Sequence, residues 1–381
     1  MPNIVSPNRK IKILETIRQG QIGGGESHVL DLVPNLNKEE FEPVVLSFTD
    51  GPMVDKLKEA GIKTYVVHTE KPFDKSVRER VGKIFDDEKF DLLHAHGTRS
   101  LSNTYYCATN RKVPIIYTVH GWSFHQDQNF FVKKLRIMSE KFLIKRTDLT
   151  IVVSEANKRD GIENCGMERY QLVHYGINLD KYNPDKSYPD LKKELQIPDG
   201  KTSVAFIVRM TTQKDPMTVV RAAAIVAKKT RDVYFLMIGD GDLKENAISL
   251  SKELGLDESV IRFHNFRQDV PAVLNSIDIY TLPSLWEGLP IGMLEAMAMR
   301  KAIVATPADG SKEAIQSGEN GLLVPFKNPE ALADAIIKMH NDKDLKKKCE
   351  INARLTVEKD FELHKMVRNT EDIYRKYYKK I

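Results

Sequence analysis

The feature of this sequence that most limits its fold is a repeated alternation of short, continuously apolar runs with longer segments of helical character. Runs that are apolar at every position are typical of parallel strands buried on both faces, and strand–helix–strand repetition predicts doubly wound sheets with right-handed crossovers. The candidate strands of the first half are residues 11–17, 44–48, 64–67, 91–96, 115–120 and 149–154. Those of the second half are residues 203–208, 234–239, 260–263, 277–282, 302–306 and 321–324.

A polar, proline-bearing stretch at residues 180–198 separates the two blocks of alternation. Because 381 residues exceed what one ordinary core holds, the sequence predicts an α/β protein with two Rossmann-like, doubly wound parallel-sheet domains. We place the first domain at residues 1–182 and the second at residues 183–361. The amphipathic C-terminal helix, residues 362–381, is expected to pack back onto the first domain. Ligands bind beyond the carboxyl ends of the strands in such sheets, so chemistry is sought there.

Composition narrows the class of protein. The chain is 41% hydrophobic and 29% charged, and it has no apolar run of the ~18 residues that a membrane-spanning helix needs. The N-terminal residues lack the apolar core of a secretory signal, and three scattered cysteines form no metal or disulfide pattern. We therefore expect a cytoplasmic protein. The net charge of +5 suits an anionic small molecule or a membrane surface, and no aromatic-interleaved basic stripe points to nucleic acid.

Three consecutive glycines, Gly23, Gly24 and Gly25, follow the first predicted strand and open a helix. Glycines in this place allow backbone N–H groups to approach a phosphate at a helix N-terminus. The pattern is not the G-x-G-x-x-G fingerprint of dinucleotide-binding proteins. An ordinary strand-to-helix turn is the alternative.

Two carboxylates, Glu287 and Glu295, bracket a glycine- and proline-bearing helix start after another predicted strand. Backbone N–H groups at such a start can bind anionic oxygens, and carboxylates accept hydrogen bonds from hydroxyl groups. A polyol joined to phosphate describes a nucleotide-sugar. Alternatively, Glu287 is a charge favoured by the helix dipole and Glu295 belongs to a solvated face.

The segment from Glu287 to Glu295 resembles the E-x7-E motif of the retaining GT-B glycosyltransferases of family 4 (glycosyl transferases group 1). The resemblance extends over nearly the whole chain and implies two Rossmann-like domains facing across a cleft, the first for the acceptor and the second for the nucleotide-sugar. The other matching segments, in chain order, are Gly23-Gly24-Gly25-Glu26, His94-Ala95-His96-Gly97, Val119-His120-Gly121, Val153-Ser154, Val208-Arg209 with Lys214, Gly239-Asp240-Gly241 and Gly318-Glu319-Asn320-Gly321-Leu322-Leu323-Val324.

The resemblance also implies roles for individual residues. Arg209 and Lys214 would clamp the donor diphosphate, Glu295 would hold the ribose and Glu287 would bind hydroxyls of the donor sugar. His120 would face the donor sugar. The candidate catalytic residues are thus Glu287, His120, Arg209 and Lys214. Further donor contacts would come from the backbone of Gly24, Gly25, Gly288, Leu289, Ile291, Gly292 and Met293. A surface pair is the alternative for the two cations.

No metal or other cofactor is expected. His94 and His96 share one strand face, as metal ligands can, but we find no third ligand of suitable spacing and favour packing or supporting roles. Asp240-Gly241-Asp242 spells the D-x-D metal motif, yet its glycine-bounded position after a strand favours a turn. Arg300 stands where the family commonly has glycine, and we expect it to adopt positive φ at the end of a helix.

The sequence as a whole predicts a retaining, metal-independent enzyme that moves a hexose-type sugar from a UDP- or GDP-linked donor to a saccharide or lipid-linked acceptor in polysaccharide or glycolipid biosynthesis. A nucleotide-sugar epimerase of GT-B type and a non-catalytic sugar-binding protein remain alternatives. Residues 130–146 predict a cationic amphipathic helix that either contacts an anionic membrane at its inner face or is a domain helix with a solvated basic side.

Overall fold

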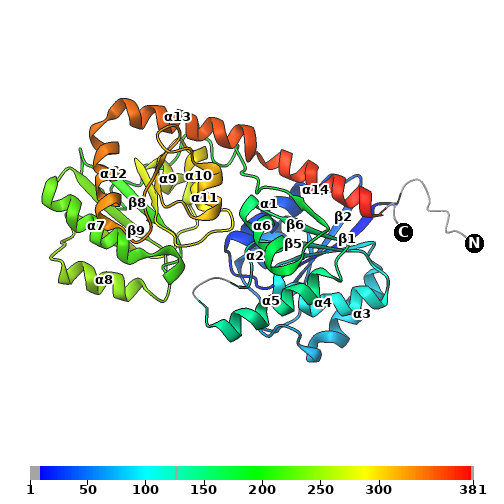
Figure 1. Cartoon of the computed structure of the whole chain (residues 1–381). Helices are drawn as coiled ribbons and strands as arrows, with labels where there is room; N and C mark the ends of the chain where they lie inside the picture. The colour runs from blue at the N-terminus through cyan, green and yellow to red at the C-terminus, as the bar shows by residue number, and fades with distance from the viewer. Residues whose placement is uncertain (1–8, 125–127, 379–381) are drawn as a thin grey trace, which may run out of the picture. The chain divides into compact units, whose positions relative to one another are not determined.

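The computed structural model describes residues 9–124 and 128–378 of the chain. It divides into two compact units, the first formed within Met1–Gly176 and Leu363–Ile381 and the second by Ile177–Glu362 (Figure 1). The chain therefore enters the second unit after Gly176 and returns to the first at Leu363.

The first unit is built on a seven-stranded parallel sheet with the order β3-β2-β1-β4-β5-β6-β7. The order reverses between β1 and β4, which are hydrogen-bonded neighbours, so the carboxyl ends of these strands form the place where such sheets bind ligands. The strands are β1 (Ile11–Ile17), β2 (Phe41–Ser47), β3 (Lys63–Val66), β4 (Leu92–His96), β5 (Ile115–Val119), β6 (Leu149–Val152) and β7 (Tyr170–Leu172). The helices are α1 (Gly24–Leu32), α2 (Pro52–Glu59), α3 (Arg78–Glu88), α4 (Thr98–Asn110), α5 (Phe130–Ile144), α6 (Glu155–Cys165) and α14 (Leu363–Tyr378), with short 3₁₀ helices η1 (Val33–Asn35) and η2 (Lys75–Val77).

The second unit has a six-stranded parallel sheet with the order β10-β9-β8-β11-β12-β13. Its reversal point lies between β8 and β11. The strands are β8 (Thr202–Ile207), β9 (Val233–Ile238), β10 (Ile261–His264), β11 (Ile279–Leu282), β12 (Ala302–Ala305) and β13 (Leu322–Leu323). The helices are α7 (Pro216–Lys229), α8 (Lys244–Glu253), α9 (Val270–Asn275), α10 (Ile291–Ala298), α11 (Asp309–Ala314), α12 (Pro329–Asn341) and α13 (Lys343–Asp360), with one 3₁₀ helix, η3 (Thr212–Lys214).

The predicted fold class is confirmed, because each candidate strand is present with ends shifted by a few residues. Continuous apolar runs form the central strands: β9 is buried at all six positions and β5 at all five. The sequence did not predict β7, since its three residues are partly exposed and carry no apolar run.

Helix α14 (red in Figure 1) packs on the sheet of the first unit although more than 180 residues separate it from the preceding element of that unit. Tyr374 is fully buried, and its ring meets that of Phe41 edge to face with centroids 5.8 Å apart. Arg375 forms two hydrogen bonds of 2.7 Å with the carboxylate of Glu40. The apolar side of α14 thus completes the core of the first unit, and Arg375 on its other side holds the helix in position along the sheet.

Two further turns behave as the sequence predicts. Arg300 follows α10 with φ 52°, in the left-handed region, which confirms the expected conformation. Asp240 stabilises the turn between β9 and α8. Its carboxylate accepts hydrogen bonds from the N–H of Phe266 at 2.9 Å and from Lys244 Nζ at 2.8 Å. Gly241 is required there, since a Cβ would lie 2.3 Å from the carbonyl oxygen of Met210.

Candidate active site

The predicted cation Lys214 and the predicted acid Glu287 form an ion pair in the second unit. Lys214 ends η3, which follows β8, and Glu287 lies in the connection after β11. Backbone and side-chain bonds join these two connections, because Leu285 N–H donates to the Gln213 carbonyl and Gln213 Nε2 donates to the Trp286 carbonyl, both at 2.8 Å. Adjacent strands at the reversal point therefore bring a cation and a carboxylate from distant segments together.

Glu287 and Glu295 both lie close enough to a buried tyrosine, Tyr280 of β11, for their charges to act on its hydroxyl. Burial raises the pKa of Tyr280, and the charges of Glu295 and Glu287 raise it further. The Tyr280 hydroxyl also lies under the start of α10, since a Cβ on Gly292 would be 3.0 Å from it. Glu295 accepts a hydrogen bond from the hydroxyl of Tyr182. The two glutamates predicted from the sequence thus share one neighbourhood.

The N-terminus of α10 offers backbone donors beside this pair. Pro290 is the residue before the helix, and no side chain caps it. The N–H of Met293 is already engaged, because it donates to the Pro290 carbonyl at 3.1 Å. In the described part of the chain no corresponding bond is made by the N–H groups of Ile291 and Gly292. Of the backbone donors predicted at the helix itself, Ile291 and Gly292 therefore make no such bond within the described chain, whereas Met293 does.

Arg209 lies two residues after the end of β8, on the same connection as Lys214, and is exposed. Within residues 9–124 and 128–378, no carboxylate forms an ion pair with it. The loop between β11 and α10 packs tightly against α11, since a Cβ on Gly310 would lie 2.2 Å from the Gly288 carbonyl oxygen and 2.6 Å from Cα of Leu289. Gly288 and Leu289 therefore shape the loop.

The glycine segment of the first unit lies against His120. Gly23 precedes α1, Gly24 begins it, and a Cβ on Gly25 would lie 3.1 Å from Cδ2 of the His120 ring. His120 follows β5 at the carboxyl edge of the sheet. Only glycine therefore fits between the start of α1 and this histidine without displacing the ring.

A buried hydrogen-bonded network lies behind His120. His120 Nε2 is 3.0 Å from Nδ1 of His96, and His96 Nε2 is 2.9 Å from Oε2 of Glu15. On the other side of the ring, the Tyr175 hydroxyl lies 2.7 Å from His120 Nδ1. Tyr374 of α14 donates to Oε1 of Glu15 at 2.6 Å. The network thus joins β1, β4, the residue after β5 and the C-terminal helix.

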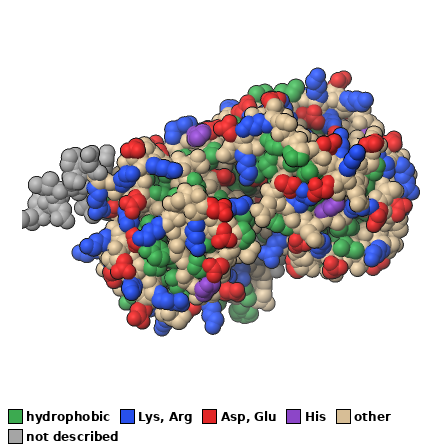
Figure 2. Space-filling view, turned by 180° about the vertical axis from the view of Figure 1, so that it is seen from behind, with side chains coloured by type: hydrophobic (Ala, Val, Ile, Leu, Met, Phe, Trp, Pro, Cys, Tyr) green, Lys and Arg blue, Asp and Glu red, His purple; other side chains and the backbone are tan. Residues whose placement is uncertain are grey.

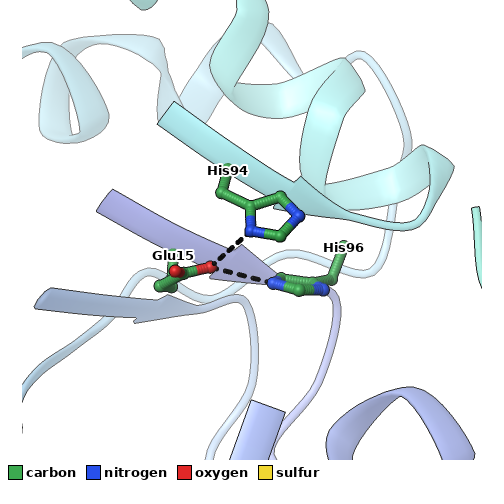
Figure 3. Close-up of side chains that lie close together, drawn as sticks. All are labelled: Glu15, His94 and His96. Atoms are coloured by element: carbon green, nitrogen blue, oxygen red, sulfur yellow. Dashed lines mark hydrogen bonds and ion pairs between the residues drawn. The ribbon is translucent and has the colours of Figure 1, made fainter. Parts of the chain in front are cut away.

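The expectation that His94 and His96 lack a third partner of suitable geometry is wrong. Figure 3 shows one carboxylate oxygen of Glu15 of β1 reaching both imidazoles, with Oε2 3.1 Å from Nδ1 of His94 and 2.9 Å from Nε2 of His96. The three ligand atoms lie within 4.8 Å of one another, a spacing that a metal ion could bridge. The signal was present in the sequence, because Glu15 is an acid in a strand predicted to be buried.

Hydrogen bonding accounts for every nitrogen of this cluster. His94 Nδ1 is 2.6 Å from the Tyr374 hydroxyl and its Nε2 is 2.7 Å from the Thr118 hydroxyl. Both nitrogens of His96 are likewise engaged, with Glu15 and His120. A metal ion would have to displace these bonds, so the donor set fits a hydrogen-bonded network better than a metal centre.

Burial favours the neutral form of three histidines, His28, His96 and His120, and the surroundings of Glu15 favour its ionised form. Burial lowers the pKa of His96 to about 4 and lowers the pKa values of His28 and His120 well below their usual range. Burial alone would raise the pKa of Glu15, but its electrostatic and hydrogen-bond interactions with His94 and His96 outweigh burial and lower that pKa.

These protonation states fix the tautomers along the chain of bonds. Because ionised Glu15 can only accept, His96 carries its proton on Nε2 and accepts at Nδ1 from Nε2–H of His120. His120 Nδ1 then accepts the hydrogen of the Tyr175 hydroxyl. His120 is therefore a neutral imidazole with both nitrogens engaged.

The predicted residues thus fall into two sets. Arg209, Lys214, Glu287 and Glu295 gather at the carboxyl edge of the second sheet, while Gly24, Gly25 and His120 meet at that of the first. Sequence reasoning missed Tyr182, Gln213 and Glu15.

Comparison with known proteins agrees with this geometry. The model of the family described as "Glycosyl transferases group 1" matches residues 187–356, and that described as "Glycosyltransferase Family 4" matches residues 22–181. An Escherichia coli relative, UDP-Gal:alpha-D-GlcNAc-diphosphoundecaprenol alpha-1,3-galactosyltransferase, is 24% identical over 97% of this chain and 98% of its own. A Campylobacter jejuni relative, N,N'-diacetylbacillosaminyl-diphospho-undecaprenol alpha-1,3-N-acetylgalactosaminyltransferase, is 28% identical over 70% of this chain and 72% of its own.

Among solved structures, Anabaena HepE in complex with UDP and glucose has a similar fold, with a TM-score of 0.85 at 21% identity over 96% of this chain and 100% of its own. The two family models together span both units, and the fold of each unit agrees with them. The chain therefore belongs to the GT-B glycosyltransferases of family 4, the glycosyl transferases group 1.

Proposed function

We propose that this glycosyltransferase moves a hexose-type sugar from a nucleoside-diphosphate sugar to a hydroxyl group of a saccharide or lipid-linked acceptor, with retention at the anomeric carbon. The observation that carries the proposal is the pairing of Lys214 with Glu287 beside the uncapped start of α10. A cation and free backbone N–H groups suit a diphosphate, and a carboxylate next to them suits the hydroxyls of the attached sugar.

The chemistry follows from the charges. Departure of the nucleoside diphosphate leaves negative charge that Arg209 and Lys214 can stabilise, which is the part a divalent ion plays in other enzymes. We propose on this basis that the reaction needs no metal ion or other cofactor. The acceptor hydroxyl attacks from the same face through an oxocarbenium-like state, and the leaving phosphate takes its proton. No side chain acts as nucleophile.

His120 takes part as a neutral group in this proposal. Its ring nitrogens are engaged with His96 and Tyr175, and its pKa is lowered by burial and by the neighbouring histidines His28 and His96. Such an imidazole does not bring a positive charge near an oxocarbenium-like centre. A role as general base would require it to give up one of these bonds.

Relatives support a lipid-linked acceptor. The names of the Escherichia coli and Campylobacter jejuni proteins both describe transfer to a diphosphoundecaprenol-linked sugar. None of the described helices of this chain has the length and apolar character needed to cross a bilayer. We therefore propose that the enzyme meets such an acceptor through a peripheral contact with the inner membrane face.

The nucleotide is identified by measuring thermal shifts with UDP, GDP and ADP. A ligand at about 100 times its dissociation constant should stabilise the protein by about 2.7 kcal/mol. Turnover with the matching sugar donors then tests transfer, and NMR of the anomeric proton of the product tests retention. An inverted product would overturn the mechanism, and no stabilisation by any nucleoside diphosphate would overturn the donor class.

Two alternatives give different results in the same assays. A nucleotide-sugar epimerase would consume donor without any acceptor. A non-catalytic sugar-binding protein would bind sugar without affinity for a nucleotide.

A further inference from the structure

Helix α5 carries an unusual row of exposed apolar side chains, Phe131, Leu135, Met138 and Phe142, which we call the apolar stripe. Their spacing of four, three and four residues places them on one helix face. Phe131 is 77% exposed, Leu135 68% and Met138 58%. Phe142, 36% exposed, anchors the far end of the stripe by edge-to-face contacts with Phe73 and Tyr105.

The opposite face of α5 holds the helix in the fold without help from the stripe. Leu143 and Ile144 are buried in the core of the first unit. Glu140, fully buried, accepts hydrogen bonds from the hydroxyls of Ser123 and Thr98 at 2.6 and 2.7 Å. A helix fixed in this way normally turns polar residues outward. Here the outward side is apolar, which marks an interaction surface.

Positive charges flank the stripe. Lys134, Lys141 and Lys145 recur at helical spacing along one side of it, and all three are exposed. On the other side, the guanidinium of Arg146 lies over the Phe142 ring at 3.5 Å. The sole acid of α5, Glu140, is buried, so the exposed side of the helix has no negative charge. By contrast, Figure 2 shows basic and acidic side chains intermixed on the face that it draws.

We propose that the apolar stripe of α5 is a membrane-docking surface that inserts into the interface of a bilayer containing anionic lipids. Large apolar side chains flanked by lysines are the composition of helices that lie in this interface. A second copy of the chain fits less well, because both sides of the stripe are positive and a contact between two stripes would bring positive flanks together. The proposal rests on the proposed function, since it brings the first unit to the surface where a lipid-linked acceptor lies.

Helix α13 of the second unit supplies a matched control. Ile351 and Leu355 are also exposed, 47% and 53%, and one helical turn apart. Their helix, however, carries acidic residues such as Glu350 and Glu358 among its lysines. Helix α13 therefore presents a similar pair of exposed apolar side chains, but the charges around them are of both signs.

The test is co-sedimentation of the full chain with vesicles of phosphatidylcholine alone or with phosphatidylglycerol. The wild type should bind the anionic vesicles, and added salt should weaken the binding. Phe131→Ser with Leu135→Ser should lower the affinity by about tenfold or more, because two large side chains no longer leave water. Lys134→Gln with Lys141→Gln should lower it selectively for the anionic vesicles. Ile351→Ser with Leu355→Ser should leave it unchanged.

Three outcomes would overturn the proposal: no binding of the wild type to anionic vesicles at low salt, equal binding by the stripe variant, or dissociation of an oligomer by the stripe substitutions in sedimentation velocity. The last would make the stripe a protein interface. Nucleoside-diphosphate binding and turnover of a water-soluble acceptor report on the proposed function separately, and the stripe variant should retain both.

Discussion

Nε2 of His96 donates a hydrogen bond to Oε2 of Glu15 across 2.9 Å in the interior of the first unit, where neither side chain is exposed. Eighty-one residues separate the two in the sequence. They meet because β1 and β4 are neighbours at the reversal point of the sheet. Through His96 the pair orients His120, so a candidate site histidine depends on an acid that never reaches the surface.

Replacement of that acid should loosen the network. Glu15→Gln leaves one amide in place of a carboxylate that serves His94, His96 and Tyr374 at once. We expect the free energy of unfolding to fall by about 3 kcal/mol, because buried hydrogen bonds to a charged acceptor are lost and an amide N–H is left without an acceptor. Urea denaturation measures this change.

Glu26→Gln is the matched control for this substitution. Burial raises the pKa of Glu26, and its ion pair with Arg18 is long, 3.8 Å, so a neutral amide should cost much less there. Nitrogen-15 NMR of the imidazoles supplies a second measurement: the His96 and His120 tautomers should be single in the wild type and mixed in Glu15→Gln. Equal stability of both variants would contradict the role given to Glu15.

Stability should also fall in mild acid. Burial lowers the folded-state pKa values of His28, His96 and His120 below the unfolded value of about 6.5. As pH falls below that value the unfolded chain takes up protons that the folded chain does not, so stability is greatest above it. Between pH 6.5 and 5, each histidine should cost on the order of 2 kcal/mol.

Urea titrations at pH 7, 6 and 5 test this dependence. His28→Asn removes one of the three titrating histidines. It breaks no hydrogen bond at Nδ1, because this atom of His28 has no partner in the described chain. The dependence of the unfolding free energy on pH should therefore become shallower by about one proton. A free energy of unfolding that stays constant over this range would show that the histidines are not held neutral.

The cations of the second unit should control donor chemistry. Lys214→Gln and Arg209→Gln should each lower kcat/KM for the donor by about 10²–10³-fold, because a fixed positive charge no longer meets the leaving diphosphate. Lys312→Gln, which removes an exposed lysine paired with Asp309, should change it little. Affinity for the free nucleoside diphosphate should fall together with turnover. Loss of turnover with unchanged diphosphate affinity would speak against a diphosphate clamp.

Substitution of Glu287 and of Glu295 should affect two different quantities, turnover of the sugar donor and affinity for the nucleoside diphosphate. Glu287→Gln should weaken turnover of the sugar donor while it leaves affinity for the free nucleoside diphosphate near that of the wild type, since its proposed partners are sugar hydroxyls. Glu295→Gln should weaken nucleoside-diphosphate binding itself. Calorimetric titration with diphosphate, alongside donor kinetics, measures both quantities. Identical behaviour of the two variants would contradict the assignment of sugar and ribose.

Sequence patterns were sufficient for features that depend on neighbours along the chain. The buried strands follow from apolar runs and the amphipathic character of α5 from helical spacing, while the left-handed Arg300 follows from the family resemblance, in which glycine is common after this helix. The network at Glu15 could not be found in this way, because strand order and register decide which residues of β1 and β4 are adjacent. The bond between Tyr182 and Glu295, 113 residues apart, is hidden for the same reason.

The strain at Arg300 gives a last prediction that separates two opposing effects. Its φ of 52° costs a non-glycine residue about 1 kcal/mol. Its guanidinium, however, forms two hydrogen bonds with the carboxylate of Asp185, at 2.7 and 3.1 Å. Asp185→Asn removes the ion pair and keeps the strain, whereas Arg300→Gly removes both. Because exposed ion pairs contribute little, urea denaturation should find Arg300→Gly more stable than Asp185→Asn by about 1 kcal/mol. The reverse order would mean that the side chain of Arg300 stabilises the turn through packing rather than merely tolerating it.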